Sequence, residues 1–144
     1  MNIFGIFITV YIAMIAASFW ESYVEGRNAW DKKKHGWKIK LGSFTLTGYH
    51  FYLFVIMFPT LLALPFVING WDTKLFGILL SAYFSGMVIQ DFMWYVVNPV
   101  VKFNELNSDF ANYYPRVRFG KVKIPIFYFL SIGIAVFSWL LLWK

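Results

Sequence analysis

Charge is almost missing from four long stretches of this sequence, residues 2–20, 51–68, 75–97 and 124–143. Asp91 is the one formally charged residue that they contain. Because a helix rises about 1.5 Å per residue, roughly 20 residues cross a hydrocarbon core about 30 Å thick. Charged residues make up 14% of the chain and hydrophobic ones 60%, against about 25% and roughly 45–50% in soluble domains. The pattern excludes a water-soluble fold and predicts an integral membrane protein.

Cysteine is also absent, which excludes disulfides, thiolate metal ligands and a cysteine nucleophile. The sequence has neither the His-Glu-x-x-His helix of zinc proteases nor the paired Glu-x-x-His helices of di-iron bundles. Four spans in 144 residues leave no room for a separate soluble catalytic domain. We therefore expect a single all-α membrane domain over residues 1–144, a four-transmembrane-helix bundle, and the sequence leaves open whether it is an enzyme.

Basic residues are concentrated in two connections. Residues 21–50 and 98–123 contain eleven of the thirteen Lys and Arg residues, and the other two are Lys74 and Lys144. The positive-inside rule predicts a multi-pass protein of the cell membrane, with both long connections in the cytoplasm and both termini outside. The cations should also attract anionic lipid headgroups, by about 1 kcal/mol each near the surface. No nucleic-acid-binding fold accompanies them, so we expect no nucleic-acid partner.

The start of the first stretch, the two connections and two prolines support further structural predictions. The first stretch has no basic start, and we expect a retained helix rather than a signal peptide. Alternation over residues 37–47 around Gly42 and Ser43 predicts a short cytoplasmic β-hairpin. In the second connection, the apolar residues of 101–110 predict an interfacial amphipathic helix, and residues 116–123 a strand or an extended segment. Pro59 and Pro65 predict kinks in the second span.

Ionisable residues from three spans approach one level of the membrane. Glu21 and Glu25 lie one helical turn apart where the first span ends, and His50 opens the second span. Asp91 lies about 10 Å inside the cytoplasmic end of the third span. We expect these four side chains to converge on one site. Polar neighbours that could support it are Gln90, Trp94, Asn98 and Arg27.

Asp91 carries most of the argument for function. A carboxylate at mid-span costs about 2.5–3.5 kcal/mol on insertion scales, so it should face the bundle and have a partner. A functional site and a hydrogen bond that only locks helices together both satisfy this requirement. An Asp91 that faces the fourth span or lipid would rule out a common four-residue site and make an accessory subunit of a membrane complex the leading hypothesis.

Three hypotheses for function follow. Carboxylates and an imidazole form a mixed oxygen and nitrogen set, suited to a divalent cofactor such as Mn²⁺, Fe²⁺ or Zn²⁺, and the protein would then act on a lipid-soluble substrate. The same residues could instead relay protons or bind a cationic substrate in an oligomeric transporter or channel. The third hypothesis is an accessory subunit of a larger membrane complex. The expected partners are the lipid bilayer and either further copies of the chain or other membrane subunits.

The segments Glu21-x-x-x-Glu25-Gly26, Tyr49-His50 and Asp91-Phe92-x-Trp94-x-x-x-Asn98-Pro99 resemble a family of small prokaryotic four-helix membrane proteins. The resemblance covers residues 21–99. It implies a four-helix membrane fold and brings no activity, substrate or cofactor. Small multidrug transporters share the number of spans but resemble this chain poorly, because their essential carboxylate lies midway along the first helix, where this chain is apolar.

Overall fold

The computed structural model describes residues 1–42 and 44–144. Its main elements are four helices long and apolar enough to cross a membrane. The first is α1 (Ile3–Glu25) and the third is α4 (Thr73–Val97). The second, Gly48–Asn69, is continuous through α2 (Gly48–His50), the π-helix η1 (Phe51–Met57) and α3 (Phe58–Asn69). The fourth, Ile126–Trp143, joins α5 (Ile126–Ser138) to the π-helix η4 (Trp139–Trp143).

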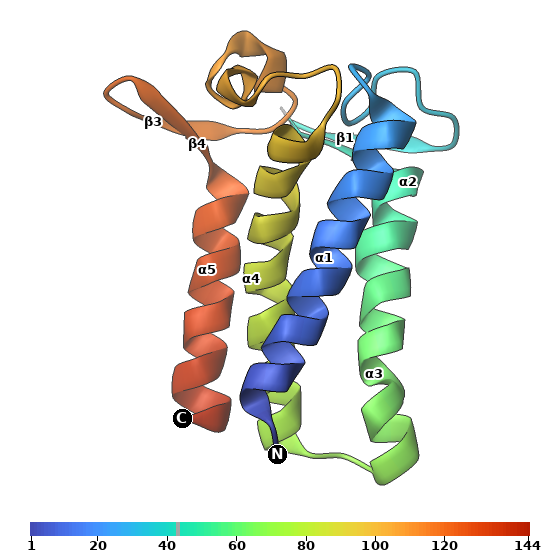
Figure 1. Cartoon of the computed structure of the whole chain (residues 1–144), viewed down its shortest axis with the longest axis vertical. Helices are drawn as coiled ribbons and strands as arrows, with labels where there is room; N and C mark the ends of the chain where they lie inside the picture. The colour runs from blue at the N-terminus through green and yellow to red at the C-terminus, as the bar shows by residue number, and fades with distance from the viewer. Residues whose placement is uncertain (43) are drawn as a thin grey trace.

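Helix α4 lies at the centre of the bundle, between α1 and α5 (Figure 1). Small residues allow the close approach that lipid-embedded helices need. A Cβ atom added at Gly86 would lie 3.0 Å from Met14 Cγ of α1, and one added at Gly77 would lie 2.5 Å from Leu142 Cβ of η4. Hydroxyl groups join the helices as well, since Ser138 Oγ donates to the Gly77 carbonyl at 2.8 Å.

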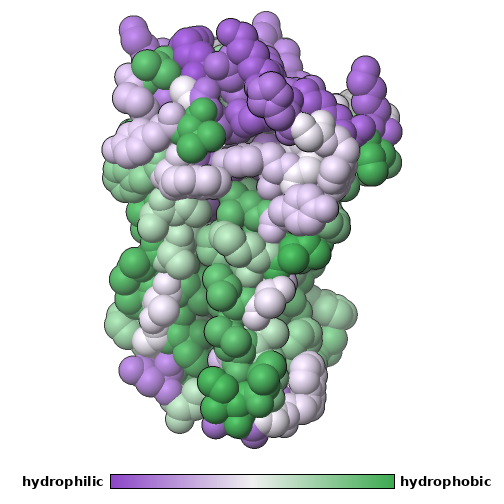
Figure 2. All heavy atoms as spheres, turned by 90° about the vertical axis from the view of Figure 1, so that its right-hand side faces the viewer, coloured by the Kyte–Doolittle hydropathy of each residue, from purple (hydrophilic) through white to green (hydrophobic). Residues whose placement is uncertain are grey.

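Both chain termini lie at one end of the bundle and both long connections at the other (Figure 1). The connections contain two antiparallel hairpins, β1 (Lys38–Leu41) with β2 (Phe44–Thr47), and β3 (Arg116–Phe119) with β4 (Val122–Pro125). Figure 2 shows hydrophilic residues gathered over this end, mostly hydrophobic ones over the middle of the visible face, and a few hydrophilic ones at the opposite end. We call it the basic end, because the connections carry eleven of the thirteen cations. Its location in the cytoplasm stays a prediction.

The expected hairpin over residues 37–47 is confirmed, although Ser43 of its turn lies outside the described residues. Residues 116–123 also form most of a second hairpin, β3–β4. The expected interfacial helix over 101–110 is not formed as one amphipathic α-helix. Two short 3₁₀-helices, η2 (Phe103–Asn107) and η3 (Asp109–Ala111), replace it. The reason is that Val101 is buried against Trp94 and Tyr95, with Leu106 and Phe110 packed on the same cluster, so most of the apolar side chains face protein, and Phe103 alone among them is 51% exposed.

The second membrane helix departs from α-geometry where Pro59 interrupts it. In the π-helix η1 the Phe58 N–H donates to the Leu53 carbonyl, five residues back. The same spacing would pair the Phe54 carbonyl with the nitrogen of Pro59, which has no hydrogen to donate. The Tyr83 hydroxyl of α4 donates to the Phe54 carbonyl instead. Since a lone carbonyl in hydrocarbon costs several kcal/mol, this bond explains how the helix tolerates Pro59.

Candidate functional site

The first membrane helix continues five residues beyond its expected end at Trp20. Glu21 and Glu25 therefore belong to the last turns of α1, one turn apart. Both side chains face the bundle and are buried, with 4% and 5% of each residue exposed. Ser18 Oγ of α1 donates to the Gln90 carbonyl of α4 at 2.8 Å, and this contact fixes the side of α1 that faces α4.

His50 is held at the start of the second membrane helix by the turn before it. Thr47 caps this helix, and its hydroxyl oxygen accepts the His50 backbone N–H at 3.3 Å. The same oxygen lies 2.7 Å from His50 Nδ1. On one face of the imidazole, Trp30 stacks at 3.9 Å between ring centroids. The ring is thereby oriented with Nε2 toward the two glutamates.

Glu21, Glu25 and His50 together form what we call the Glu–Glu–His group. Each offers one ligand atom, and the three atoms lie within 4.8 Å of one another. His50 Nε2 is 3.4 Å from Glu21 Oε1 and 4.0 Å from Glu25 Oε1. Two tetrahedral ligands bound at about 2.0–2.1 Å are separated by about 3.4 Å. The His50–Glu21 pair already has this separation, and the His50–Glu25 pair is only slightly wider.

Outer hydrogen bonds prepare the group for an ion. When His50 Nδ1–H donates to Thr47 Oγ1, the Nε2 lone pair is free to bind a metal, which is the usual arrangement of a metal-bound histidine. The Gln90 side-chain amide donates to Glu21 Oε2 and leaves Oε1 to face His50. Lys34 Nζ, by contrast, lies 3.0 Å from Glu25 Oε1, the oxygen that faces His50, so it partly balances the charge of the carboxylates but would have to give up this contact to an ion.

A cavity of about 30 Å³ adjoins the group. About 10–15 Å³ is enough for one water molecule, so the cavity has room for an ion together with one ligand oxygen beside the three side chains. Trp94 lines it, and the buried Trp94 Nε1–H has no hydrogen-bond partner among the described residues. Glu21 Oε1 likewise accepts no hydrogen bond there. Two residues that line one small cavity thus have a donor and an acceptor without partners among the described residues, which suits an exogenous ligand.

Asp91 also lines this cavity, but its carboxylate is engaged elsewhere. Tyr128 of α5 donates to Asp91 Oδ2 at 2.6 Å, and Tyr114 of the second connection donates to it at 3.4 Å. The expectation that Asp91 is a fourth ligand in the same group therefore differs from the structure. Its turn toward the fourth membrane helix argues against the common four-residue site and gives Asp91 a part in joining α4 to α5.

Two of the expected supporting residues act outside the group. Arg27 forms a bidentate pair with Glu105, at 3.1 and 2.7 Å, and donates to the Val100 carbonyl at 2.9 Å. Asn98 donates to the Gly26 carbonyl at 3.0 Å and accepts backbone N–H bonds from the turn after α4. Hydrogen bonds from Arg27 lower the pKa of Glu105 to about 2. Both residues join the two connections at the basic end, whereas Gln90 and Trp94 do adjoin the Glu–Glu–His group.

Lys34, Thr47 and Trp30 are parts of the site that the sequence did not reveal. For Thr47 a signal exists, because a threonine before the first helical residue is a preferred N-cap. Trp30 has a positive φ of 62°, a conformation that costs a bulky residue energy and often occurs at functional sites. Nothing in a run of three lysines distinguishes Lys34 from its neighbours.

Neither a family model, nor a curated protein, nor a solved structure matches the chain. The resemblance to small prokaryotic four-helix membrane proteins therefore stays a prediction.

Proposed function

We propose that this protein binds a divalent metal ion at the Glu–Glu–His group and presents it to a lipid-soluble substrate. One observation carries the proposal: three buried residues from two membrane helices hold their ligand atoms within 4.8 Å of one another. Burying two carboxylates away from water is costly unless the negative charge of each is balanced by a nearby positive charge or by hydrogen bonds. A divalent ion compensates both glutamates at once.

The donor set favours Mn²⁺, Fe²⁺ or Zn²⁺ over Ca²⁺ and Mg²⁺, because imidazole suits the transition ions and the latter prefer oxygen alone. Three protein ligands also leave a position open, as in catalytic zinc sites, whereas structural sites are closed by four. Trp94, whose buried N–H has no partner among the described residues, lines the same cavity. The proposed centre therefore binds a further ligand in addition to the protein.

Metal analysis of detergent-purified protein tests the proposal, with Glu21→Gln and His50→Gln as variants. The matched control is Asp109→Asn, which removes the same charge from a carboxylate that is 85% exposed and lies outside the cavity. We expect a single ion per chain in the wild type and the control, and its loss in both variants. Equal metal content in all four proteins, or failure of the metal-free wild type to bind any of the three ions, would falsify the proposal.

A second function is favoured by the position of Asp91. Because its carboxylate joins α4 to α5 through Tyr128, the polar residues of the third membrane helix are partly structural, as expected of an accessory subunit in a membrane complex. Co-purification from native membranes distinguishes this alternative: a stable stoichiometric partner together with a metal-free chain would support it.

A further inference from the structure

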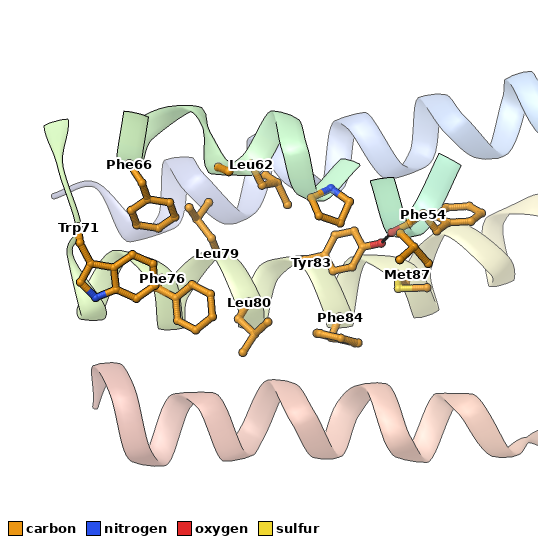
Figure 3. Close-up of a pocket in the computed structure, with 13 residues that line it drawn as sticks. Phe54, Leu62, Phe66, Trp71, Phe76, Leu79, Leu80, Tyr83, Phe84 and Met87 are labelled. Carbon is orange, nitrogen blue, oxygen red and sulfur yellow. Dashed lines mark hydrogen bonds between the residues drawn. The ribbon is translucent and has the colours of Figure 1, made fainter. Parts of the chain in front are cut away.

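A pocket of about 450 Å³ lies between the second and third membrane helices (Figure 3). Leu62 and Phe66 of α3 face Phe76, Leu79 and Tyr83 of α4 across it. It lies between two membrane-spanning helices and is partly open, so it is a hollow in the side of the bundle. Its volume falls within the range of about 300–1,000 Å³ that is typical of ligand pockets.

The lining of this pocket selects hydrocarbon. Among its described residues, Tyr83 and Trp71 alone carry a side-chain oxygen or nitrogen. The Tyr83 hydroxyl is already bonded to the Phe54 carbonyl, and Trp71 Nε1 donates to Thr73 Oγ1 at 3.1 Å. The pocket therefore offers no free hydrogen-bond donor from these two side chains, and a polar ligand would lose its hydration there without compensation.

The apolar pocket adjoins the small cavity beside the Glu–Glu–His group, which we call the metal cavity. Phe54 lines both of them, and its ring lies parallel to the His50 imidazole with centroids 6.2 Å apart. In the other direction the pocket extends to Phe66, twelve residues further along the helix, a distance of about 18 Å at 1.5 Å per residue. A linear chain lying in the pocket thus has one end beside the Glu–Glu–His group.

The metal cavity restricts the polar end of such a ligand. Its volume of about 30 Å³ accommodates a hydroxyl or a carbonyl oxygen but not a phosphate headgroup. Trp94 lines this cavity, and its buried N–H, which has no partner among the described residues, could donate to an acceptor such as oxygen. The formal charges of Glu21, Glu25, Asp91 and Lys34 at or beside the cavity are cancelled by one divalent ion, so an uncharged oxygen fits better than a carboxylate.

We propose that the pocket binds the hydrocarbon tail of a long-chain lipid whose uncharged oxygen, a hydroxyl or carbonyl, reaches the metal past Phe54. This inference rests on the proposed metal function and names the class of its substrate. The ligand enters sideways from the bilayer, since the pocket opens between two membrane helices. Phe54 separates the two cavities and has to turn aside when the oxygen binds.

The test uses the full-length protein in phosphatidylcholine vesicles with a long-chain primary alcohol that carries a photoreactive diazirine at its methyl end. With the hydroxyl at the metal, the methyl end lies near Phe66 and Phe76, and cross-links should map there. Unlabelled long-chain alcohol and the matching aldehyde are competitors, and the one that competes better identifies the oxygen. The matching fatty acid should compete more weakly than either.

Ala63→Trp places a large side chain in the pocket, whereas Leu64→Trp, on the same helix, adds one to a residue that is 49% exposed and does not line it. We expect Ala63→Trp to abolish the mapped cross-link with its metal retained, and Leu64→Trp to keep both. Cross-links spread over outward-facing residues such as Val67, without competition, would show bulk lipid only and overturn the inference.

Metal content measured on the same samples separates the two proposals. Normal metal with unspecific cross-linking overturns the lipid site alone. A chain that binds no metal overturns the metal centre, and with it the coordination of the lipid oxygen, whatever the cross-linking shows.

Discussion

If the Glu–Glu–His group binds a metal as proposed, Lys34 competes with the ion for Glu25, and replacement of Lys34 by methionine should strengthen metal binding. Lys34 Nζ lies 3.0 Å from Glu25 Oε1, with 11% of the Lys34 side chain and 5% of the Glu25 side chain exposed. Methionine keeps an unbranched apolar stem of similar shape and removes the charge. The substitution therefore removes the competing cation and retains most of the packing.

The size of the effect follows from this contact. A hydrogen bond to a charged group contributes about 1.5–3 kcal/mol, and each 1.4 kcal/mol is about tenfold in affinity. If the ion has to break the Lys34–Glu25 contact, Lys34→Met should tighten binding of Zn²⁺ or Mn²⁺ by about 10-fold to about 150-fold. The metal-free variant should also be less stable than the metal-free wild type, because Glu25 then lacks its partner.

Isothermal titration of metal-free protein in detergent measures the affinity, and thermal unfolding with and without metal measures the stability. Lys33→Met is the matched control, since Lys33 is the exposed preceding residue and carries the same charge. Unchanged or weaker binding in Lys34→Met would refute the competition, and so would an equal gain in Lys33→Met, because the effect would then be one of net charge.

Three further perturbations test the fold around the site. Tyr83→Phe leaves the Phe54 carbonyl without its donor and should destabilise the protein by about 1–3 kcal/mol in a denaturant titration, whereas an unchanged midpoint would contradict the account of Pro59. Gly77→Val places a Cβ 2.5 Å from Leu142 Cβ and should cost about 1–3 kcal/mol, measured in the same way. The pKa of Glu105 is lowered to about 2, so the stabilisation from its pair with Arg27 is present above the ordinary carboxylate pKa and lost as the pH falls toward 2. Thermal unfolding should show Glu105→Gln destabilised at neutral pH and converging with the wild type in acid.

The membrane helices were predictable because a single property, the absence of charge over about 20 residues, is enough to specify each of them. The ends of these helices were less predictable. Glu21 and Glu25 are polar, and the apolar stretch stops at Trp20, yet the helix continues because both carboxylates are buried against Gln90 and His50. Tertiary partners decide such a boundary, and one span read alone does not contain them.

Glu21, Glu25 and His50 could be placed together because all three lie at helix ends, where topology fixes the level in the membrane. Asp91 lies inside a helix, and its contacts depend on how that helix is rotated relative to its neighbours. Its hydrogen-bond partners, Tyr114 and Tyr128, come from the second connection and the fourth membrane helix. Helices apolar on every side carry little information about rotation, so sequence alone gave Asp91's level in the membrane but not its direction.

Pro59, Tyr83 and Phe54 connect the distortion of the second membrane helix to the site. Pro59 leaves the Phe54 carbonyl free, and Tyr83 reaches across from α4 to bind it. The π-helix η1, which contains Phe54, has a wider turn than an α-helix. His50 of the Glu–Glu–His group directly precedes η1 in the chain. Phe54 also lies between the cavity beside the Glu–Glu–His group and the apolar pocket. The hydrogen bond from Tyr83 to the Phe54 carbonyl therefore also holds the backbone between the two cavities. The carbonyl that Pro59 leaves without a backbone donor thus belongs to Phe54, the residue at which the apolar pocket meets the proposed metal centre.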